Sequence, residues 1–154
     1  MLLEISNYLE LVKKLDYDLG RYNKNNHIYE LMDCLMILNA LPEWIKESSE
    51  ASTSLKTLAA AKILVMKGSG FTLDESKLDT DIDHQLRFIR LICNHSKHKT
   101  DSPLIPVIRS KYGATLPMTL PAKLYHIIAI GHKEVDAEYL IQNVGGFWKS
   151  EINK

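Results

Sequence analysis

The sequence predicts a mainly α-helical protein, a bundle of four or five helices followed by a small C-terminal β-hairpin and a closing helix. Two observations predict this fold. Before residue 99, apolar residues recur at steps of three and four, which is the spacing of one side of a helix. After it, prolines separate two runs that are typical of strands. With 154 residues and 45% hydrophobic composition, we expect one domain over 1–154, with the bundle in 1–99 and the hairpin and last helix in 100–154.

Three helices are expected in the first half of the chain. A stripe of apolar residues predicts a helix over residues 2–22, and a second stripe starting at Ile28 predicts another that Pro42 ends. Residues 48–54 are polar and small, as in a loop. A third helix is then expected from Leu55 to Lys67, where the sequence Gly-Ser-Gly provides a stop.

The second half of the chain begins with a fourth helix. It is expected to start near Thr80 or Asp81, where Thr80 can cap it and Asp81 and Asp83 place negative charge at the positive end of the helix dipole. It is expected to continue to His98 and to be largely central in the bundle. Two strands are expected over 104–112 and 124–130, joined by a long connection that contains proline. A closing helix is expected over 134–152, where two adjacent glycines permit a kink.

Composition limits the classes of function. The formal net charge is +0, so the whole molecule is not drawn towards nucleic acid or an anionic membrane, and any site for a polyanion must be local. The chain opens on Met1-Leu-Leu-Glu without a basic segment and contains no apolar run of membrane-spanning length, so we expect a cytoplasmic protein with no membrane partner. Cys34 and Cys93 lie within apolar helical patterns, which indicates buried reduced thiols rather than a disulfide framework.

The fourth helix carries the one chemically suggestive pattern in the sequence. The stretch from 74 to 83 is acidic, whereas His84 to Lys99 contains basic residues and no acid. On a helical wheel a basic, hydrogen-bonding stripe spans about 100°. Its members are Arg87, Arg90, Asn94, Lys97 and His98. The stripe is either a solvated helix face or a binding site.

His95 lies apart from this stripe. At about 100° per residue it is about 140° around the helix from Arg90 and close to Phe88 and Leu91. A histidine among apolar neighbours is either a hydrogen-bonded core residue or a catalytic group, and the wheel alone leaves both open.

These residues resemble the signature of the HEPN family. In that signature an arginine is followed after four to six residues by a histidine, near the end of a helix in a small bundle, and Arg90-Leu-Ile-Cys-Asn-His95 has this form. Residues 92–98 are also similar to the Ile-Cys-Asn-x-x-Lys-His motif of a group of small bacterial proteins. Leu91 stands where the family pattern often has a polar residue, and Arg21 with His27 gives a second match to the arginine-to-histidine spacing.

The resemblance implies a metal-independent endoribonuclease that acts as a homodimer, in the manner of a toxin or a phage-defence effector. It implies catalytic roles for Arg90, Asn94, His95 and His98, and RNA binding by Arg87, Lys97 and Lys99. No metal and no cofactor are expected, and the partners are RNA, a second copy and a protein such as an antitoxin. Two other readings remain open: a non-catalytic helical accessory protein that binds RNA or protein, and a metal site at His95, His98, His84 and Cys93.

Overall fold

The computed structural model describes residues 6–97, 105–112 and 124–154, and it confirms the mainly helical fold with a small antiparallel sheet and a closing helix. The elements are α1 (Tyr8–Asn25), α2 (Ile28–Lys46), α3 (Thr53–Lys67), a short 3-10 helix η1 (Glu75–Lys77), α4 (Ile82–Lys97), β1 (Val107–Tyr112), β2 (Leu124–Ile130), β3 (Lys133–Asp136) and α5 (Ala137–Ile152).

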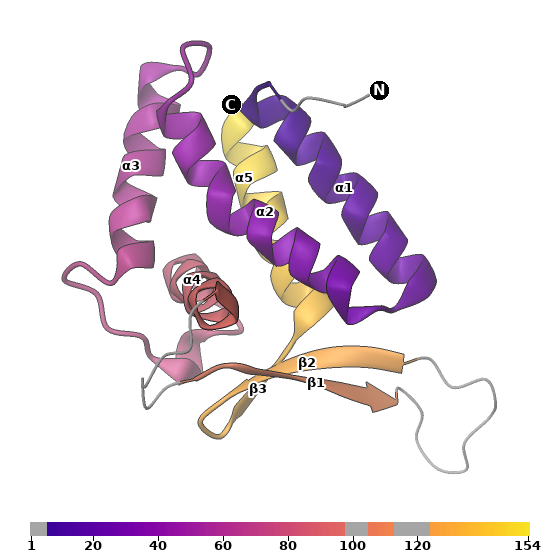
Figure 1. The fold of residues 1–154 in the computed structure, drawn as a ribbon. Coiled ribbons are helices and arrows are strands. Elements are labelled where there is room, and N and C mark those ends of the chain that lie inside the picture. The colour runs from indigo at the N-terminus through magenta and orange to yellow at the C-terminus, as the bar shows by residue number, and fades with distance from the viewer. Residues whose placement is uncertain (1–5, 98–104, 113–123) are drawn as a thin grey trace.

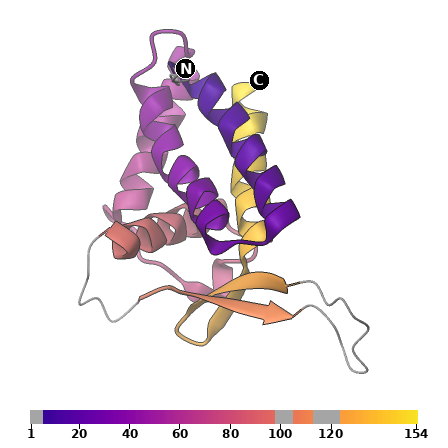
Figure 2. The ribbon, with the colours of Figure 1, turned by 45° about the vertical axis from the view of Figure 1, so that its right-hand side comes forward.

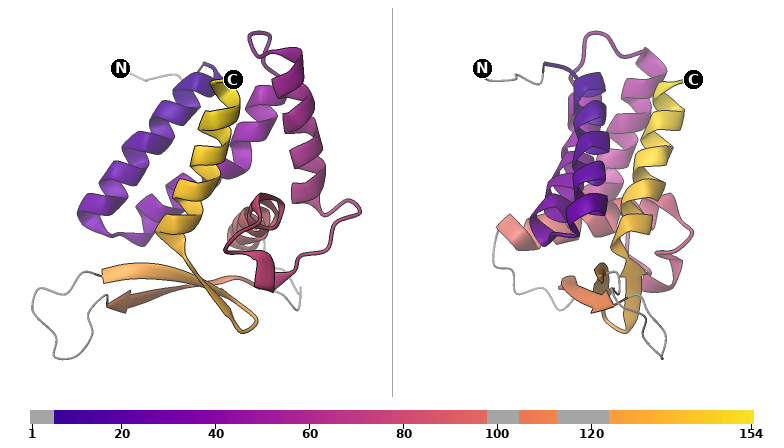
Figure 3. Two further views of the ribbon diagram at one scale, coloured as in Figure 1. Left: turned by 180° about the vertical axis from the view of Figure 1, so that it is seen from behind. Right: turned by 90° about the vertical axis from the view of Figure 1, so that its right-hand side faces the viewer.

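The helices stand over the sheet, which lies across one end of the bundle (Figure 1). Helices α1, α2 and α5 pack together, and α3 packs on α2 (Figures 1 and 2). Helix α4 runs crosswise beneath them, close to the sheet, and contacts α2, α3 and α5 (Figure 3). The expectation that this helix is central is therefore confirmed.

Helix α2 continues through Pro42, so the prediction that this proline ends the helix is wrong. Pro42 lies inside α2, which runs on to Lys46. A proline in a helix interior costs about 3 kcal/mol. Leu41 and Ile45 are both fully buried, and burial of each contributes about 1.5–3 kcal/mol. Packing of the last turn therefore outweighs the cost of the proline.

The helix ends are fixed by side-chain caps. Ser52 caps α3, and Gly68 ends it in the left-handed region at φ +76°, as the sequence predicts for the stop. At α4 the cap is Asp81 rather than Thr80. Its carboxylate accepts hydrogen bonds from the backbone N–H groups of Asp83 (2.9 Å) and His84 (3.2 Å).

The sheet has three antiparallel strands in the order β1-β2-β3, one more than the expected hairpin. Residues 133–136, where the closing helix was expected to begin, form β3, which pairs with β2 through Ile130 and Lys133. Gly131, at φ +56°, opens the two-residue turn between them. Helix α5 starts only after Asp136, whose carboxylate accepts from the Tyr139 N–H at 2.8 Å.

One buried polar contact joins α1 to the sheet. The Tyr22 hydroxyl and Nδ1 of His126 are 2.8 Å apart, and the two residues are 2% and 3% exposed. Burial raises the pKa of Tyr22 to about 12, with smaller effects from Glu138 and Asp136. Burial, followed by the neighbouring His27, lowers the pKa of His126 below its ordinary 6.5. The contact is therefore maintained by a neutral tyrosine and a neutral histidine.

This contact predicts a pH-dependent stability. Between the lowered folded pKa of His126 and 6.5, the unfolded chain binds more protons than the folded one. The stability from this residue is thus present above about pH 6.5 and is lost as the pH falls through that window. Chemical unfolding at pH 7.5 and pH 5 measures how much the free energy of unfolding falls between the two. This fall should be smaller for His126→Phe than for the wild type. Equal losses in the two proteins would contradict this assignment.

Two adjacent glycines in α5 have different surroundings. A Cβ on Gly145 would lie 3.2 Å from Cδ2 of Leu15 in α1, whereas one on Gly146 would meet nothing within 4 Å. Leu15 is 3% exposed and tightly enclosed. Gly145 therefore allows α5 to approach α1 closely.

The two glycines form a matched pair for mutation. Gly146→Ala should raise the free energy of unfolding by about 0.5–1 kcal/mol, because alanine loses less conformational freedom in a helix than glycine. Gly145→Ala should show no such gain, because its methyl group would press on Leu15. Thermal denaturation measures both, and an equal gain at the two positions would show that the close approach has no energetic consequence.

Candidate functional site

Helix α4 presents one apolar side to the core and leaves its remaining sides half-buried. The buried apolar residues are Leu86, Phe88, Ile89, Ile92 and Cys93. Arg90, Asn94 and His95 lie in the half-buried part of the same helix. They occupy its last two turns, beyond the reach of the acidic residues that precede it.

Those acidic residues are engaged in structural contacts. Asp81 caps α4, Asp83 accepts a hydrogen bond from Nζ of Lys62 at 2.7 Å, and Asp79 pairs with Lys133. Asp74 caps η1 through the N–H and hydroxyl of Ser76, whose hydrogen bonds lower the pKa of its carboxyl group. These four carboxylates therefore serve as caps or ion-pair partners before and at the start of α4, whereas Arg87 and Arg90 lie further along the helix.

Arg87, which is expected to bind RNA, packs against the end of α3. Its Nη1 donates to the Met66 carbonyl at 2.7 Å. Its guanidinium also covers Gly68, where an added Cβ would lie 2.9 Å from Cζ of the arginine. Burial, followed by the nearby charge of Arg90, lowers the pKa of Arg87. Part of the Arg87 guanidinium is therefore engaged by the carbonyl end of α3.

Arg90 differs from the other arginine that fits the family spacing. Arg21 is 3.3 Å from Oε1 of Glu30 and 3.6 Å from Oδ1 of Asp18, and both carboxylates are buried. In the part of the chain that the structure describes, no ion pair or hydrogen bond is recorded for Arg90 or for Asn94. The positive charge of Arg21 is thus balanced by carboxylates within the fold. The positive charge of Arg90 has no such partner among the described residues, so it is available to a ligand.

His95 lines a small pocket between α4, the start of α2 and the start of β1. The other lining residues are Ile28, Met32, Ile92, Pro106, Val107 and Ile108, and the volume is about 290 Å³. Nδ1 of His95 is shielded from solvent and has no hydrogen-bond partner among the described residues. A buried polar atom without a partner is uncommon and calls for an explanation.

Three of the expected site residues are not fully described. The backbone of Lys97 belongs to α4, but its side chain lies outside the described part, as do His98 and Lys99 entirely. Of the two histidines that could be functional, His95 and His98, only His95 therefore lies among the described residues. Helix α4 continues past His95 to Lys97, so His95 keeps the helical position that directs it towards Ile28 and Ile92.

The remaining histidine and cysteines near α4 have structural surroundings. Nδ1 of His84 accepts the Asp74 N–H at 3.0 Å, and its ring lies 4.7 Å from that of Phe71. Both cysteine side chains are buried, and burial raises the pKa of Cys34 to about 12. Within residues 6–97, 105–112 and 124–154, no three His, Cys, Asp or Glu side chains are grouped to hold a metal ion.

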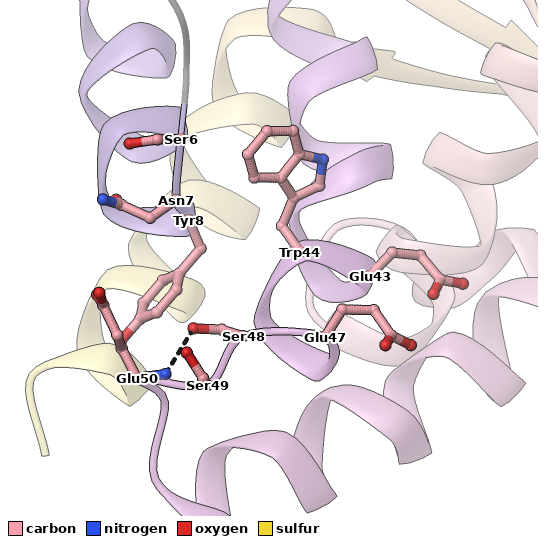
Figure 4. A pocket seen from close by; sticks show the side chains of 9 residues that line it. All are labelled: Ser6, Asn7, Tyr8, Glu43, Trp44, Glu47, Ser48, Ser49 and Glu50. Atoms are coloured by element: carbon pink, nitrogen blue, oxygen red, sulfur yellow. Dashed lines mark hydrogen bonds between the residues drawn. The ribbon is translucent and has the colours of Figure 1, made fainter.

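A second hollow lies at the end of the bundle away from the sheet (Figure 4). It measures about 460 Å³ and is lined by Ser6, Asn7, Tyr8, Glu43, Trp44, Glu47, Ser48, Ser49 and Glu50. The carboxylates of Glu43 and Glu47 point away from the Trp44 indole and from the start of α1 (Figure 4). Because its charged groups do not converge, we place the candidate site at α4 instead.

Comparison of the chain with protein-family models, with curated proteins and with solved structures finds no match. Among the described residues, no helix combines the length and the apolar character needed to cross a membrane. The case for a function therefore depends on the residues of α4.

The two arginines of α4 should differ in their effect on stability. Arg87→Met should lower the free energy of unfolding by about 1.5–3 kcal/mol, because it removes a charged hydrogen-bond donor from the Met66 carbonyl. Arg90→Met should change it by less than about 0.5 kcal/mol, as expected of a side chain without such a contact. Urea denaturation of the two variants tests the difference, and a larger loss at Arg90 would overturn the distinction.

Proposed function

We propose that this protein is a HEPN-like, metal-independent endoribonuclease whose half-site consists of Arg90, Asn94 and His95. One observation carries the proposal. Within six residues of one helix, an arginine, an amide and an imidazole nitrogen have no hydrogen-bond partner in the described part of the chain. Fixed polar groups left unpaired in a fold are available to a ligand or a reacting group.

The arginine suits a phosphodiester. A guanidinium is a planar cation that presents parallel N–H donors to two oxygens of one phosphate. As the attacking oxygen approaches phosphorus, negative charge grows on those oxygens, and Arg90 would stabilise it more strongly than in the ground state. The Asn94 amide, one turn further along, would orient the same phosphate.

The histidine suits proton transfer. Histidine is the side chain that most often transfers protons in catalysis, and His95 of one copy would take the proton from a ribose 2′-hydroxyl while the O2′–P bond forms. The histidine of a second copy would return a proton to the leaving 5′-oxygen as the P–O5′ bond breaks. The products would be a 2′,3′-cyclic phosphate and a 5′-hydroxyl, and no metal takes part.

A homodimer would complete the site. One half-site supplies one arginine, Arg90, and one described histidine, His95, whereas acid and base roles need two histidines and a locally high positive charge. Ile28, Tyr29 and Val107 are exposed apolar residues at or next to the His95 pocket, and they offer surface that a second copy would cover. A role as a toxin or a phage-defence effector would follow from indiscriminate RNA cleavage.

The same apolar residues favour a second candidate function, a non-catalytic accessory protein that binds another protein here. Ile28 and Val107 line the hollow and are exposed, and Tyr29, next to Ile28 in the sequence, is exposed too, as is common in protein interfaces. In that case Arg90 and Asn94 would meet the polar rim of the partner. Activity assays separate the two candidates directly.

Incubation of the protein with total RNA should yield fragments with 2′,3′-cyclic phosphate ends, with and without EDTA. Arg90→Ala should abolish cleavage, a loss of at least about 100-fold expected for a group that stabilises transition-state charge. His95→Ala should do the same with little change in melting temperature, and His98→Ala tests the alternative histidine.

Lys46→Ala provides the control, because it removes one exposed positive charge at the far end of α2. It should cleave like the wild type. Light scattering at micromolar concentration should give the mass of a dimer. Full cleavage by the Arg90, His95 and His98 variants, or a strict monomer, would count against the proposed site.

A further inference from the structure

The outer edge of β1 is open to a further strand. The sheet has the order β1-β2-β3, so among the described residues β1 has a partner strand on one side only. Every second residue of β1 therefore directs its backbone N–H and C=O groups away from β2, and such an edge is a template for another strand. We propose that this edge binds an extended acidic segment of another protein, which adds a strand to the sheet and places an apolar side chain in the His95 pocket.

The inference goes beyond the proposed function by naming a partner, and binding of that partner does not depend on ribonuclease activity. The added strand would cover Ile28 and Val107, which are also residues that a second copy would cover. A bound strand would therefore displace the second copy and stop cleavage, and this consequence alone rests on the proposed function.

The pocket lies where a side chain of the added strand would reach. Ile108 packs against the helices and lines the pocket, together with Pro106 and Val107 at the start of β1. In an antiparallel pair, the residue opposite Ile108 points to the same face, with its Cβ about 4.5–5.5 Å from that of Ile108. All the lining residues except His95 are apolar, so the pocket suits an aliphatic side chain. Peptides that extend a sheet gain affinity from backbone pairing and specificity from pockets for alternate side chains.

The charge on the other face of β1 selects an acidic strand. Side chains alternate along a strand, so Arg109 and Lys111 share the face that points away from the helices. Lys111 pairs with Glu134 of β3, whereas Arg109 is exposed and has no ion pair in the described part of the chain. An acidic residue opposite Arg109 would stabilise the pairing, and a basic residue there would destabilise it.

The same two cations disfavour β1 of a second copy as the added strand. A two-fold axis through the middle of β1, at Arg109 or at Ser110, would place Arg109 opposite Arg109 or Lys111 of the other copy. Like charges directly opposite each other destabilise a sheet. The charge of the edge thus acts against pairing with its own copy and favours an acidic strand.

Short peptides test the edge in the full-length protein. The probe is a capped peptide of six residues, the length of β1, in which glutamate and valine alternate. With ¹³C at the methionine methyls, it should shift the signal of Met32, which lines the pocket, in a saturable way. The signal of Met66, which is 2% exposed in the core, should not move. A peptide that alternates glutamate and serine should bind at least about tenfold more weakly, because it places no apolar side chain in the pocket.

Methylation of the peptide backbone separates strand pairing from attraction between charges. One probe peptide carries N-methyl groups on its valines and another carries them on its glutamates, so sequence and charge are the same. In an edge strand the N–H groups of alternate residues face the sheet and the solvent. One methylated peptide should therefore lose binding and the other should keep it, and equal binding or equal loss would contradict strand addition.

Exchange of one charge tests Arg109. Arg109→Glu should weaken binding of the glutamate-valine peptide at least about tenfold and strengthen binding of the matched lysine-valine peptide. Lys46→Glu makes the same change of charge at the far end of α2 and should leave both affinities unchanged. An unchanged Met66 signal in both variants verifies that they fold. Undiminished binding of the acidic peptide by Arg109→Glu would reject the role of this charge and with it the acidic partner.

Three further results would overturn the inference: no shift of Met32 at about 1 mM glutamate-valine peptide, equal binding of the lysine-valine peptide by the wild type, or a Met32 signal that follows protein concentration and resists the acidic peptide. The last of these would assign the pocket to a second copy. Peptide binding by a protein that cleaves no RNA would uphold the inference and reject the ribonuclease. Cleavage by a protein that binds no acidic strand would reject the inference alone.

Discussion

Burial of one side of α4 between the other helices and the sheet is the constraint on which the site depends. Leu86, Phe88 and Ile89 are completely buried, and each contributes about 1.5–3 kcal/mol. A rotation of α4 about its axis would expose them, so the rotation is fixed. Because the rotation is fixed, the direction in which each polar side chain of the last two turns points is fixed too. Arg90 and Asn94 lie on the half-buried flank, and His95 lies against the start of α2 and β1.

Much of the fold could be predicted from periodicity and caps, because these signals are local. The apolar steps and the Gly68 stop gave α3, and alternation gave β2 with the bounds that the structure has. The errors occurred where a tertiary interaction overrides a local preference. Pro42 is accommodated because the turn that contains it buries Leu41 and Ile45, and β3 is a strand because it pairs with β2. A window of a few residues shows neither the core that buries Leu41 and Ile45 nor the strand with which β3 pairs.

The site was predictable to a similar degree. The helical wheel placed His95 among apolar neighbours, and the structure shows this, because side-chain directions along a helix follow from sequence spacing. It could not show that Arg87 is held by the Met66 carbonyl, 21 residues away, or that Tyr22 meets His126, 104 residues away. Nor could it show that Arg21 is neutralised by two buried carboxylates and Arg90 is not, because Glu30 approaches Arg21 only when α2 folds back on α1.

The close contact of α1 with α5 has a consequence for how the chain folds during synthesis. Leu15 meets Gly145, and Asp16 pairs with Lys149, so one face of α1 contacts α5, the last element along the chain. While the ribosome makes α2, α3 and α4, the α1–α2 pair keeps an apolar face open to solvent or to a chaperone. Contacts of such long sequence separation slow folding, because the loop must close before they form. Closure by α5 would therefore be the late step that makes the bundle resistant to proteases.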